Sequence, residues 1–320
     1  MKSGRSTALL ALLCTLPWAP AGAQSPNFPS RAVEVVVPYA AGGAVDAMAR
    51  AFAAEAARDT SQPWVVGTRE GAGGVVGFAY LSRANPDGYT VAFSPASPMT
   101  NSPFLNAKMP FRNSQIEPVC QVFENVFAIA VPKNSPIRSF AELADAARAR
   151  PGGLSYGHAG LGSVPHLSMA AVERSLGLRF NAVAYRGDAP LLNDALAGTV
   201  DFSAPAIASL AGKNLRVLAV LSDRRHPAYP EVPAIPELGG PPAITPGLNG
   251  LFVPSGTPAP VIARLERLCE QVAGSAGFVG SARMLSQVPR YLGAPAFKAR
   301  IEETYRANAA LVPELKIEKN

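Results

Sequence analysis

The residues best suited to bind or transform a small molecule lie in glycine-rich loops that each follow a predicted strand and precede a predicted helix. The first loop runs from Pro38 to Asp46 and contains two adjacent glycines. Glycine lets the backbone approach a ligand closely, and a helix start offers unpaired N–H groups and a partial positive charge. The pattern predicts a cradle for a carboxylate, or a tight turn in which Asp46 only caps the helix. The candidate ligand-binding residues here are Tyr39, Ala41, Gly42, Gly43, Ala44 and Asp46.

A second loop with the same arrangement lies in the other half of the chain, between Tyr156 and His166. Its Ser163 hydroxyl could reach a ligand or simply cap the next helix, and His158 could polarise a ligand carboxylate or have no special role. Two anion-binding loops, one in each half, predict a carboxylate that bridges them if the halves face each other. The candidates in this loop are His158, Gly160, Gly162 and Ser163.

Three further residues, Ser94, Arg186 and Asp201, complete the set of candidate ligand-binding positions. Arg186 lies between a predicted strand and a predicted helix, and it could hold a ligand carboxylate through two parallel hydrogen bonds or form a surface or interlobe ion pair. The glycine-rich run from Arg69 to Gly77 fails the dinucleotide-binding pattern, because Val76 occupies the third glycine position. We interpret this run as a turn near the cleft.

A competing interpretation is a secreted serine esterase. The run from Gly153 to Gly157 matches the G-x-S-x-G pattern of hydrolase nucleophiles, and the chain order Ser155, Asp201, His226 is a permitted one. The pattern requires a strand before the serine and a helix directly after it. Here Ser155 lies inside a predicted strand, so the context favours a binding protein over an enzyme.

Composition argues against several other classes. The 29 lysines and arginines are scattered over 320 residues, with a net charge of +6, and they form no basic face with interleaved aromatics that would suggest a nucleic-acid partner. His158 and His166 lack neighbouring carboxylates, and the cysteines lack metal-ligand spacing. We expect no metal, no cofactor and a monomeric chain. Cys120 and Cys269 could form a disulfide in an oxidising compartment, or stay apart.

The loops must be positioned by alternating strands and helices. Val33–Val37 is a continuous β-branched run, which is typical of a strand buried on both faces. Repeated strand–helix units predict an α/β fold with doubly wound, mainly parallel sheets, and the chain length favours two lobes. We expect lobe 1 to comprise residues 24–124 and 226–320, and lobe 2 residues 125–225. The proline-rich stretch from Pro227 to Pro246 is interpreted as a connection across the lobe boundary.

The first 23 residues have the features of a cleaved secretory signal peptide. Lys2 and Arg5 precede an apolar run over Ala8–Leu16. Ala21 and Ala23 then provide small residues at the two positions that a signal peptidase recognises. Cleavage after Ala23 would deliver the protein to the periplasm.

Taken together, these runs resemble the tripartite tricarboxylate transporter receptors, also called Bug proteins. The opening motif of that family usually reads V-P-F-x-P-G-G-x-x-D, and the second loop resembles its S-A-G-x-G-S-x-x-H-L block. The similar runs cover nearly the whole mature chain in order: Val35 to Asp46, Gly71 to Gly74, Asn85 to Thr90, Gly157 to Leu167, Tyr185 to Gly198, Val200 to Asp201, Ala211 to Lys213, Leu218 to Val220 and Gly256 to Pro258.

The resemblance implies a two-lobed periplasmic-binding-protein fold (type II) with the ligand cleft between the lobes. It implies recognition of a small organic carboxylate by Tyr39 to Ala44 and by His158 to Ser163, and delivery of this ligand to an inner-membrane tricarboxylate-type permease. A protein that presents its ligand to a membrane signalling partner is the alternative within the same class.

The chain also departs from the family pattern. Ala41 replaces the usual proline, and His158 lies where a small serine is common. The stretch from Phe202 to Leu210 is short, and Phe202 to Pro205 stand where the family usually has a polar or acidic residue facing the ligand. We therefore expect an amine-bearing ligand to lack a partner here.

Overall fold

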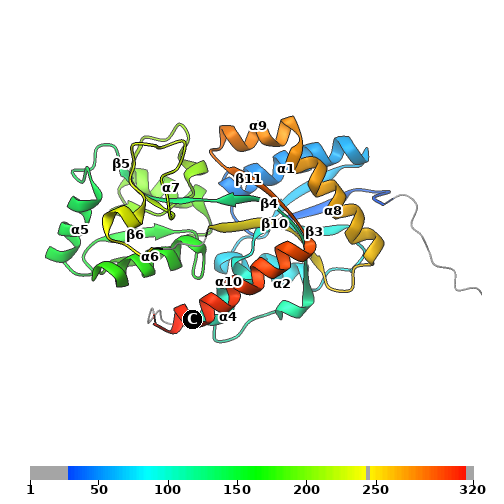
Figure 1. Cartoon of the computed structure of the whole chain (residues 1–320), viewed down its shortest axis with the longest axis horizontal. Coiled ribbons are helices and arrows are strands. Elements are labelled where there is room, and N and C mark those ends of the chain that lie inside the picture. Colours follow the sequence, from blue (N-terminus) through cyan, green and yellow to red (C-terminus); the bar gives the residue numbers. More distant parts are fainter. Residues whose placement is uncertain (1–27, 243–245, 315–320) are drawn as a thin grey trace, which may run out of the picture.

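The computed structural model describes residues 28–242 and 246–314, and the predicted signal peptide lies outside this range. The chain forms two α/β lobes that lie side by side along the longest axis of the molecule (Figure 1). Among the described residues, no helix is both long and apolar enough to cross a membrane.

The first lobe is built on a six-stranded sheet with the strand order β11-β4-β10-β3-β1-β2. Its strands are β1 (Val33–Val37), β2 (Trp64–Thr68), β3 (Thr90–Pro95), β4 (Ile116–Asn125), β10 (Gly247–Pro254) and β11 (Val288–Gly293). Its helices are α1 (Ala44–Thr60), α2 (Val75–Leu81), α3 (Ser97–Thr100), α4 (Ser102–Leu105), α8 (Ala259–Gly274), α9 (Ala276–Met284) and α10 (Ala294–Glu314).

Both faces of this sheet are covered, as the β-branched run predicts. Val35 and Val37 pack into a core with α1, α8 and α9, whereas Val36 points into a second core with α2 and α10. All three valines are fully buried. Strand β1 therefore lies between two layers of helices, and the loop that follows it begins from a rigid base.

The second lobe is built on a five-stranded sheet with the order β7-β6-β8-β5-β9. Its strands are β5 (Phe127–Pro132), β6 (Ser155–His158), β7 (Asn181–Ala184), β8 (Phe202–Ser203) and β9 (Leu215–Leu221), and its longer helices are α5 (Phe140–Ala149), α6 (Val164–Leu176) and α7 (Asp188–Ala197). Ser139 caps the start of helix α5, because its hydroxyl accepts a hydrogen bond from Glu142 N at 3.2 Å.

The α/β fold with two lobes is confirmed, but both sheets are mixed instead of mainly parallel. The pairs β1–β2, β1–β3, β6–β7 and β6–β8 are parallel. The pairs β3–β10, β4–β10, β4–β11, β5–β8 and β5–β9 are antiparallel. The reason is the path between the lobes: the chain leaves the first sheet along β4 and returns along β10, which runs beside β4 in the opposite direction (Figure 1).

The proline-rich stretch, as far as Gly240, packs on the second lobe. Val220 N donates to Pro233 O at 2.9 Å, and Ile235 lies in the core of that lobe. We therefore propose that the first crossing lies at Asn125 to Phe127 and that the return crossing lies after Gly240, later than the boundary at residue 226 expected from the sequence.

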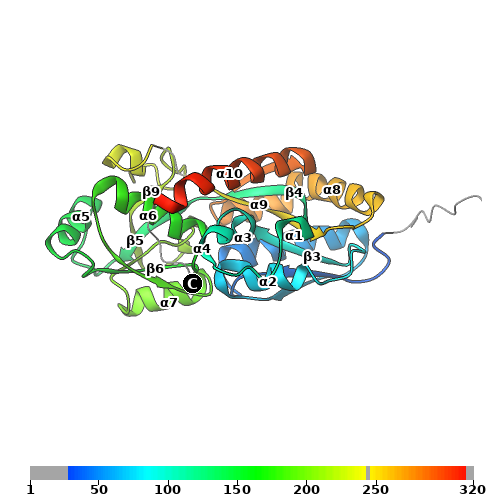
Figure 2. The ribbon, with the colours of Figure 1, turned by 90° about the horizontal axis from the view of Figure 1, so that it is seen from below.

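Two features tie distant segments together. Cys120 in β4 and Cys269 in α8 form a disulfide that spans 149 residues within the first lobe. Helix α10 lies along the first lobe, and its last turns reach the second lobe (Figure 2), where Val312 packs against Leu167 of α6 and Leu105 of α4.

Candidate ligand-binding site

The two predicted anion-binding loops face each other across the contact between the lobes. Ala40 N, in the first loop, donates to the carbonyl oxygen of Arg186 at 2.9 Å. Asn101 Nδ2 donates to the carbonyl oxygen of Gly162, in the second loop, at 2.8 Å. The lobes thus touch directly, as expected for the closed conformation of a two-lobed binding protein.

The closeness of this contact requires glycine in both lobes, because a Cβ atom on Gly73 would collide with Leu161 O and one on Gly160 would collide with Gly73. Gly160 has a φ of +111°, which disfavours other residues, and a Cβ atom there would lie 2.8 Å from Gly73 N of the first lobe. A side chain at Gly160 would therefore hold the lobes apart.

A small cavity of about 30 Å³ lies between the lobes where the loops meet. Four of the predicted ligand-binding residues line it: Tyr39, Gly43, Ala44 and Ser163. The other lining residues are Val45, Pro95, Asn125, Phe127, Ala159, Val164, Pro165, Asp188 and Ala206.

In the first loop, Asp46 fixes the turn. Gly43 is the residue before the first turn of α1, and Asp46 follows inside that turn. The Asp46 carboxylate accepts a hydrogen bond from Gly42 N at 2.9 Å and pairs with Arg50 through both oxygens at 3.0 Å. These bonds occupy the Asp46 carboxylate. Asp46 therefore holds the turn in place and does not itself line the cavity.

In the second loop, the two histidines support the turn. His158 Nδ1 is 3.0 Å from Gly160 O, His166 Nδ1 accepts from Gly162 N at 3.1 Å, and the rings stack with centroids 4.3 Å apart. Burial, together with the neighbouring His166, lowers the pKa of His158 to about 3, and burial lowers the pKa of His166 to about 4. Both rings are therefore neutral near pH 7 and bring no positive charge to a carboxylate.

Two of the residues that line the cavity each have a buried polar side-chain atom without a hydrogen-bond partner. Ser163 precedes the first turn of α6, yet its hydroxyl makes no capping bond, and both Ser163 Oγ and Asn125 Oδ1 are buried and unpaired. Buried polar atoms in folded proteins are nearly always hydrogen-bonded. These two atoms therefore mark the cavity as a place for a polar guest. Sequence reasoning missed Asn125, which is the last residue of strand β4.

Asp188 is a second cavity residue that the site prediction missed. Gly187 holds the capping position of α7, with a φ of +132°, and Asp188 is the first helical residue. Its carboxylate accepts hydrogen bonds from Ala206 N at 3.1 Å and Ser209 Oγ at 2.7 Å. Burial raises the pKa of Asp188 to about 6.

Tyr39 lines the cavity with its ring and holds the third glycine-rich loop with its hydroxyl. The hydroxyl donates to Gly73 O at 2.9 Å and lies 3.3 Å from Ser97 Oγ. Burial raises the pKa of Tyr39 to about 12, so it remains a neutral donor. The run from Arg69 to Gly77 is thus a turn at the lobe contact, as interpreted from the sequence.

The remaining predicted residues lie outside the cavity lining. Ala41 and Gly42 are exposed, and Gly160 and Gly162 are buried at the contact between the lobes. The Ser94 hydroxyl donates to Pro95 O at 2.8 Å. Arg186, with a side chain that is 74% exposed, forms an interlobe ion pair with Glu70 at 3.5 Å, which is one of the two alternatives considered for it.

Asp201 is remote from the cavity and bonds to Ser155. Ser155 N and Oγ both contact Asp201 Oδ2, at 2.7 and 2.9 Å, at the end of β6 opposite to His158. His226 accepts from Ala228 N inside its own turn. Among the described residues, the Ser155 hydroxyl bonds only to Asp201, so the serine–histidine contact of a hydrolase is missing.

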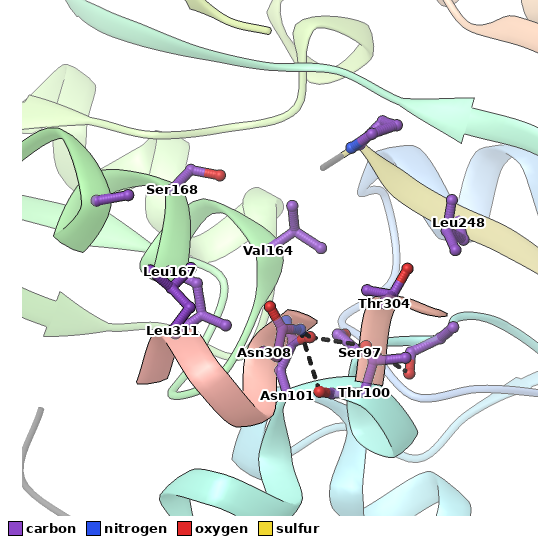
Figure 3. Close-up of a pocket in the computed structure, with 13 residues that line it drawn as sticks. Ser97, Thr100, Asn101, Val164, Leu167, Ser168, Leu248, Thr304, Asn308 and Leu311 are labelled. Carbon is purple, nitrogen blue, oxygen red and sulfur yellow. Dashed lines mark hydrogen bonds between the residues drawn. The ribbon is translucent and has the colours of Figure 1, made fainter. Parts of the chain in front are cut away.

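A second cavity, of about 80 Å³, adjoins the first and shares Val164 with it. Helices α3, α6 and α10 enclose it, and Figure 3 shows Asn308 of α10 pointing toward Thr100 and Asn101. Asn308 Nδ2 donates to Thr100 O at 3.1 Å and to Asn101 Oδ1 at 2.7 Å. Through Asn101, which also bonds to Gly162, the last helix is connected to the second loop.

Comparison with known proteins places this geometry in context. Residues 48–285 match the model of the "Tripartite tricarboxylate transporter family receptor". A protein from Pseudomonas sp. (strain P51), described as "UPF0065 protein in tcbD-tcbE intergenic region", is 35% identical over 248 residues, which cover 74% of this chain and 72% of the relative.

Solved structures agree with this match. The structure described as "R. palustris Rpa4515 with adipate" is 27% identical, with a TM-score of 0.87, and covers 92% of this chain and 100% of its own. MatC from Rhodopseudomonas palustris "with bound malate" is 27% identical, with a TM-score of 0.83, and covers 89% of this chain and 100% of its own.

Proposed function

The chain belongs to the tripartite tricarboxylate transporter receptor family, and on this premise we propose that it captures a small organic carboxylate between its lobes for an inner-membrane tricarboxylate-type permease. Its place of action is the periplasm, reached by cleavage after Ala23. Two similar structures carry adipate and malate, both of which are dicarboxylates. The receptor role involves no chemical change in the ligand.

The observation that carries the proposal is the convergence of two helix starts on one cavity. Helix α1 begins beside Gly43 and Ala44, helix α6 begins after Ser163, and all three residues line the cavity. The first turn of each helix has N–H groups without intrahelical partners, and each start carries partial positive charge. The unpaired Ser163 hydroxyl adds a donor between them. Backbone and hydroxyl donors thus replace the cationic side chains that the cavity lacks.

The size of the cavity implies that the lobes open to admit the ligand. A volume of about 30 Å³ holds on the order of two water molecules. A dicarboxylate requires more space, so it enters an open form and the lobes close on it. The crossing at Asn125 to Phe127 is a connection about which such a hinge motion occurs.

Replacing the Ser163 hydroxyl tests this proposal. Ser163→Ala removes one donor to the ligand carboxylate, and a hydrogen bond to a charged group is worth about 1.5–3 kcal/mol. We expect the Kd for the best-bound carboxylate, measured by isothermal titration calorimetry, to rise roughly 10-fold or more.

Ser102→Ala is the matched control, because Ser102 Oγ is also buried and unpaired but does not line the cavity. We expect it to keep the affinity of the wild type within about twofold, since its hydroxyl makes no ligand contact. Equal losses in both variants, or no carboxylate bound by the wild type at millimolar concentration, would overturn the proposal.

A further inference from the structure

One side chain, that of Asp188, provides the only charge among the residues that line the ligand cavity. Among its lining residues only Asp188 is ionisable near neutral pH, and none is lysine, arginine or histidine. The nearby cations are engaged elsewhere, Arg50 with Asp46 and Arg186 with Glu70. The stacked histidines under the second loop are neutral, as is Tyr39. A purely anionic guest would therefore meet a buried carboxylate and no cationic side chain.

Asp188 lies directly across the lobe contact from the start of α1. It is 9% exposed, and a Cβ atom on Gly43 would lie 3.9 Å from Asp188 Cβ. Both hydrogen bonds to the carboxylate end on Oδ2. Within residues 28–242 and 246–314, no protein donor bonds to Oδ1 and no cationic side chain forms an ion pair with Asp188. A buried carboxylate is normally paired with a positive charge, so we expect a cationic group of the ligand to pair with Asp188.

The cavity therefore has a donor side and an acceptor side. The starts of α1 and α6 and the Ser163 hydroxyl suit a carboxylate. The Asp188 carboxylate and the unpaired Asn125 Oδ1 both accept hydrogen bonds, and they suit an ammonium group, which has three donors. A ligand carboxylate and the Asp188 carboxylate repel each other in a site of low dielectric. An ammonium group between them offsets this repulsion.

We propose that the ligand is a small zwitterion, a carboxylate that also carries a protonated amine, and that Asp188 is the residue that selects it. This inference rests on the proposed function and names its substrate class. It also reverses the expectation from the short 202–210 stretch. That stretch presents Ala206 N and Ser209 Oγ to Asp188, so the acidic group comes from the start of α7.

The test compares ligand pairs that differ only in the amine: aspartate with succinate, and alanine with propionate. Calorimetry at pH 8 on the wild type should show the amine-bearing member of at least one pair binding 10-fold or more tightly. Asp188→Asn keeps one oxygen for Ala206 N and Ser209 Oγ and removes the charge. In this variant the preference should fall to threefold or less, because the amine-bearing acid binds more weakly while the amine-free acid binds equally well or more tightly.

Glu70→Gln is the matched control, because Glu70 is a carboxylate at the lobe contact that pairs with Arg186 and does not line the cavity. It should keep the full preference for the amine. If the wild type binds the amine-free acids as well as or better than their partners, the inference is overturned and the receptor function stands. If no member of either pair binds, and no other carboxylate does, both fail.

Discussion

At the scale of single residues, the site depends on groups that are buried without a full set of partners. Ser163 Oγ and Asn125 Oδ1 are unpaired, and Asp188 is a buried acid without a cation. Such groups lower the stability of the ligand-free protein and are tolerated where a ligand completes them. Asp188 is where this cost can be measured, because its side chain titrates.

We expect Asp188→Asn to stabilise the ligand-free protein at pH 8 and to have much less effect near pH 4. The folded-state pKa, about 6, is raised above the unfolded value of 3.8, so the folded protein binds this proton more tightly. The penalty of the buried charge is complete above pH 6 and disappears as the pH falls toward 3.8. At about 1.36 kcal/mol per pKa unit, it amounts to roughly 3 kcal/mol.

Urea denaturation of both proteins at pH 8 and near pH 4 measures this difference. His158 and His166 titrate in the opposite sense, because their folded-state pKa values are lowered and their stabilisation is lost as the pH falls below 6.5. Both proteins contain these histidines, so the difference between wild type and variant isolates Asp188. An equal change in unfolding free energy at the two pH values would contradict the burial of an ionised Asp188.

At the scale of elements, the loops work because rigid strands and helices present them. Sequence predicted β1 with its observed bounds, Val33–Val37, because a β-branched run flanked by turn residues has few other structures available. It also located both glycine loops. It did not single out Asp188, because the burial of this carboxylate depends on the backbone turn at Gly187 and on contacts with Ala206 and Ser209, which are distant in sequence.

We expect Gly160→Ala to prevent closure of the lobes and to reduce ligand affinity by 10-fold or more. The added Cβ would contact Gly73 N across the lobe contact at 2.8 Å. Gly177→Ala is the control, because Gly177 has a φ of +63° with open space around its Cβ position. Both variants should lose about 1–2 kcal/mol of stability from the left-handed backbone, but only Gly160→Ala should lose affinity in calorimetry. Normal affinity in Gly160→Ala would contradict the observed contact.

At the scale of the whole molecule, the two lobes meet around the ligand cavity, and we propose that the chain passes between them at Asn125 to Phe127 and again before β10. Sequence length and repeated strand–helix units were enough to predict two α/β lobes. They were not enough to predict the mixed sheets, because the direction of β10 depends on how the chain returns. The position of Asn125 at the cavity could not be predicted for the same reason, because it depends on a lobe crossing that local sequence patterns do not specify.

The most direct measurement is a crystal structure of the wild-type protein with its best-bound carboxylate. We expect the carboxylate group between the starts of α1 and α6, within hydrogen-bond distance of Ser163 Oγ and of the backbone N–H groups at Gly43 and Ala44. A ligand bound elsewhere, for example in the cavity beside α10, with Ser163 Oγ still unpaired, would contradict this account.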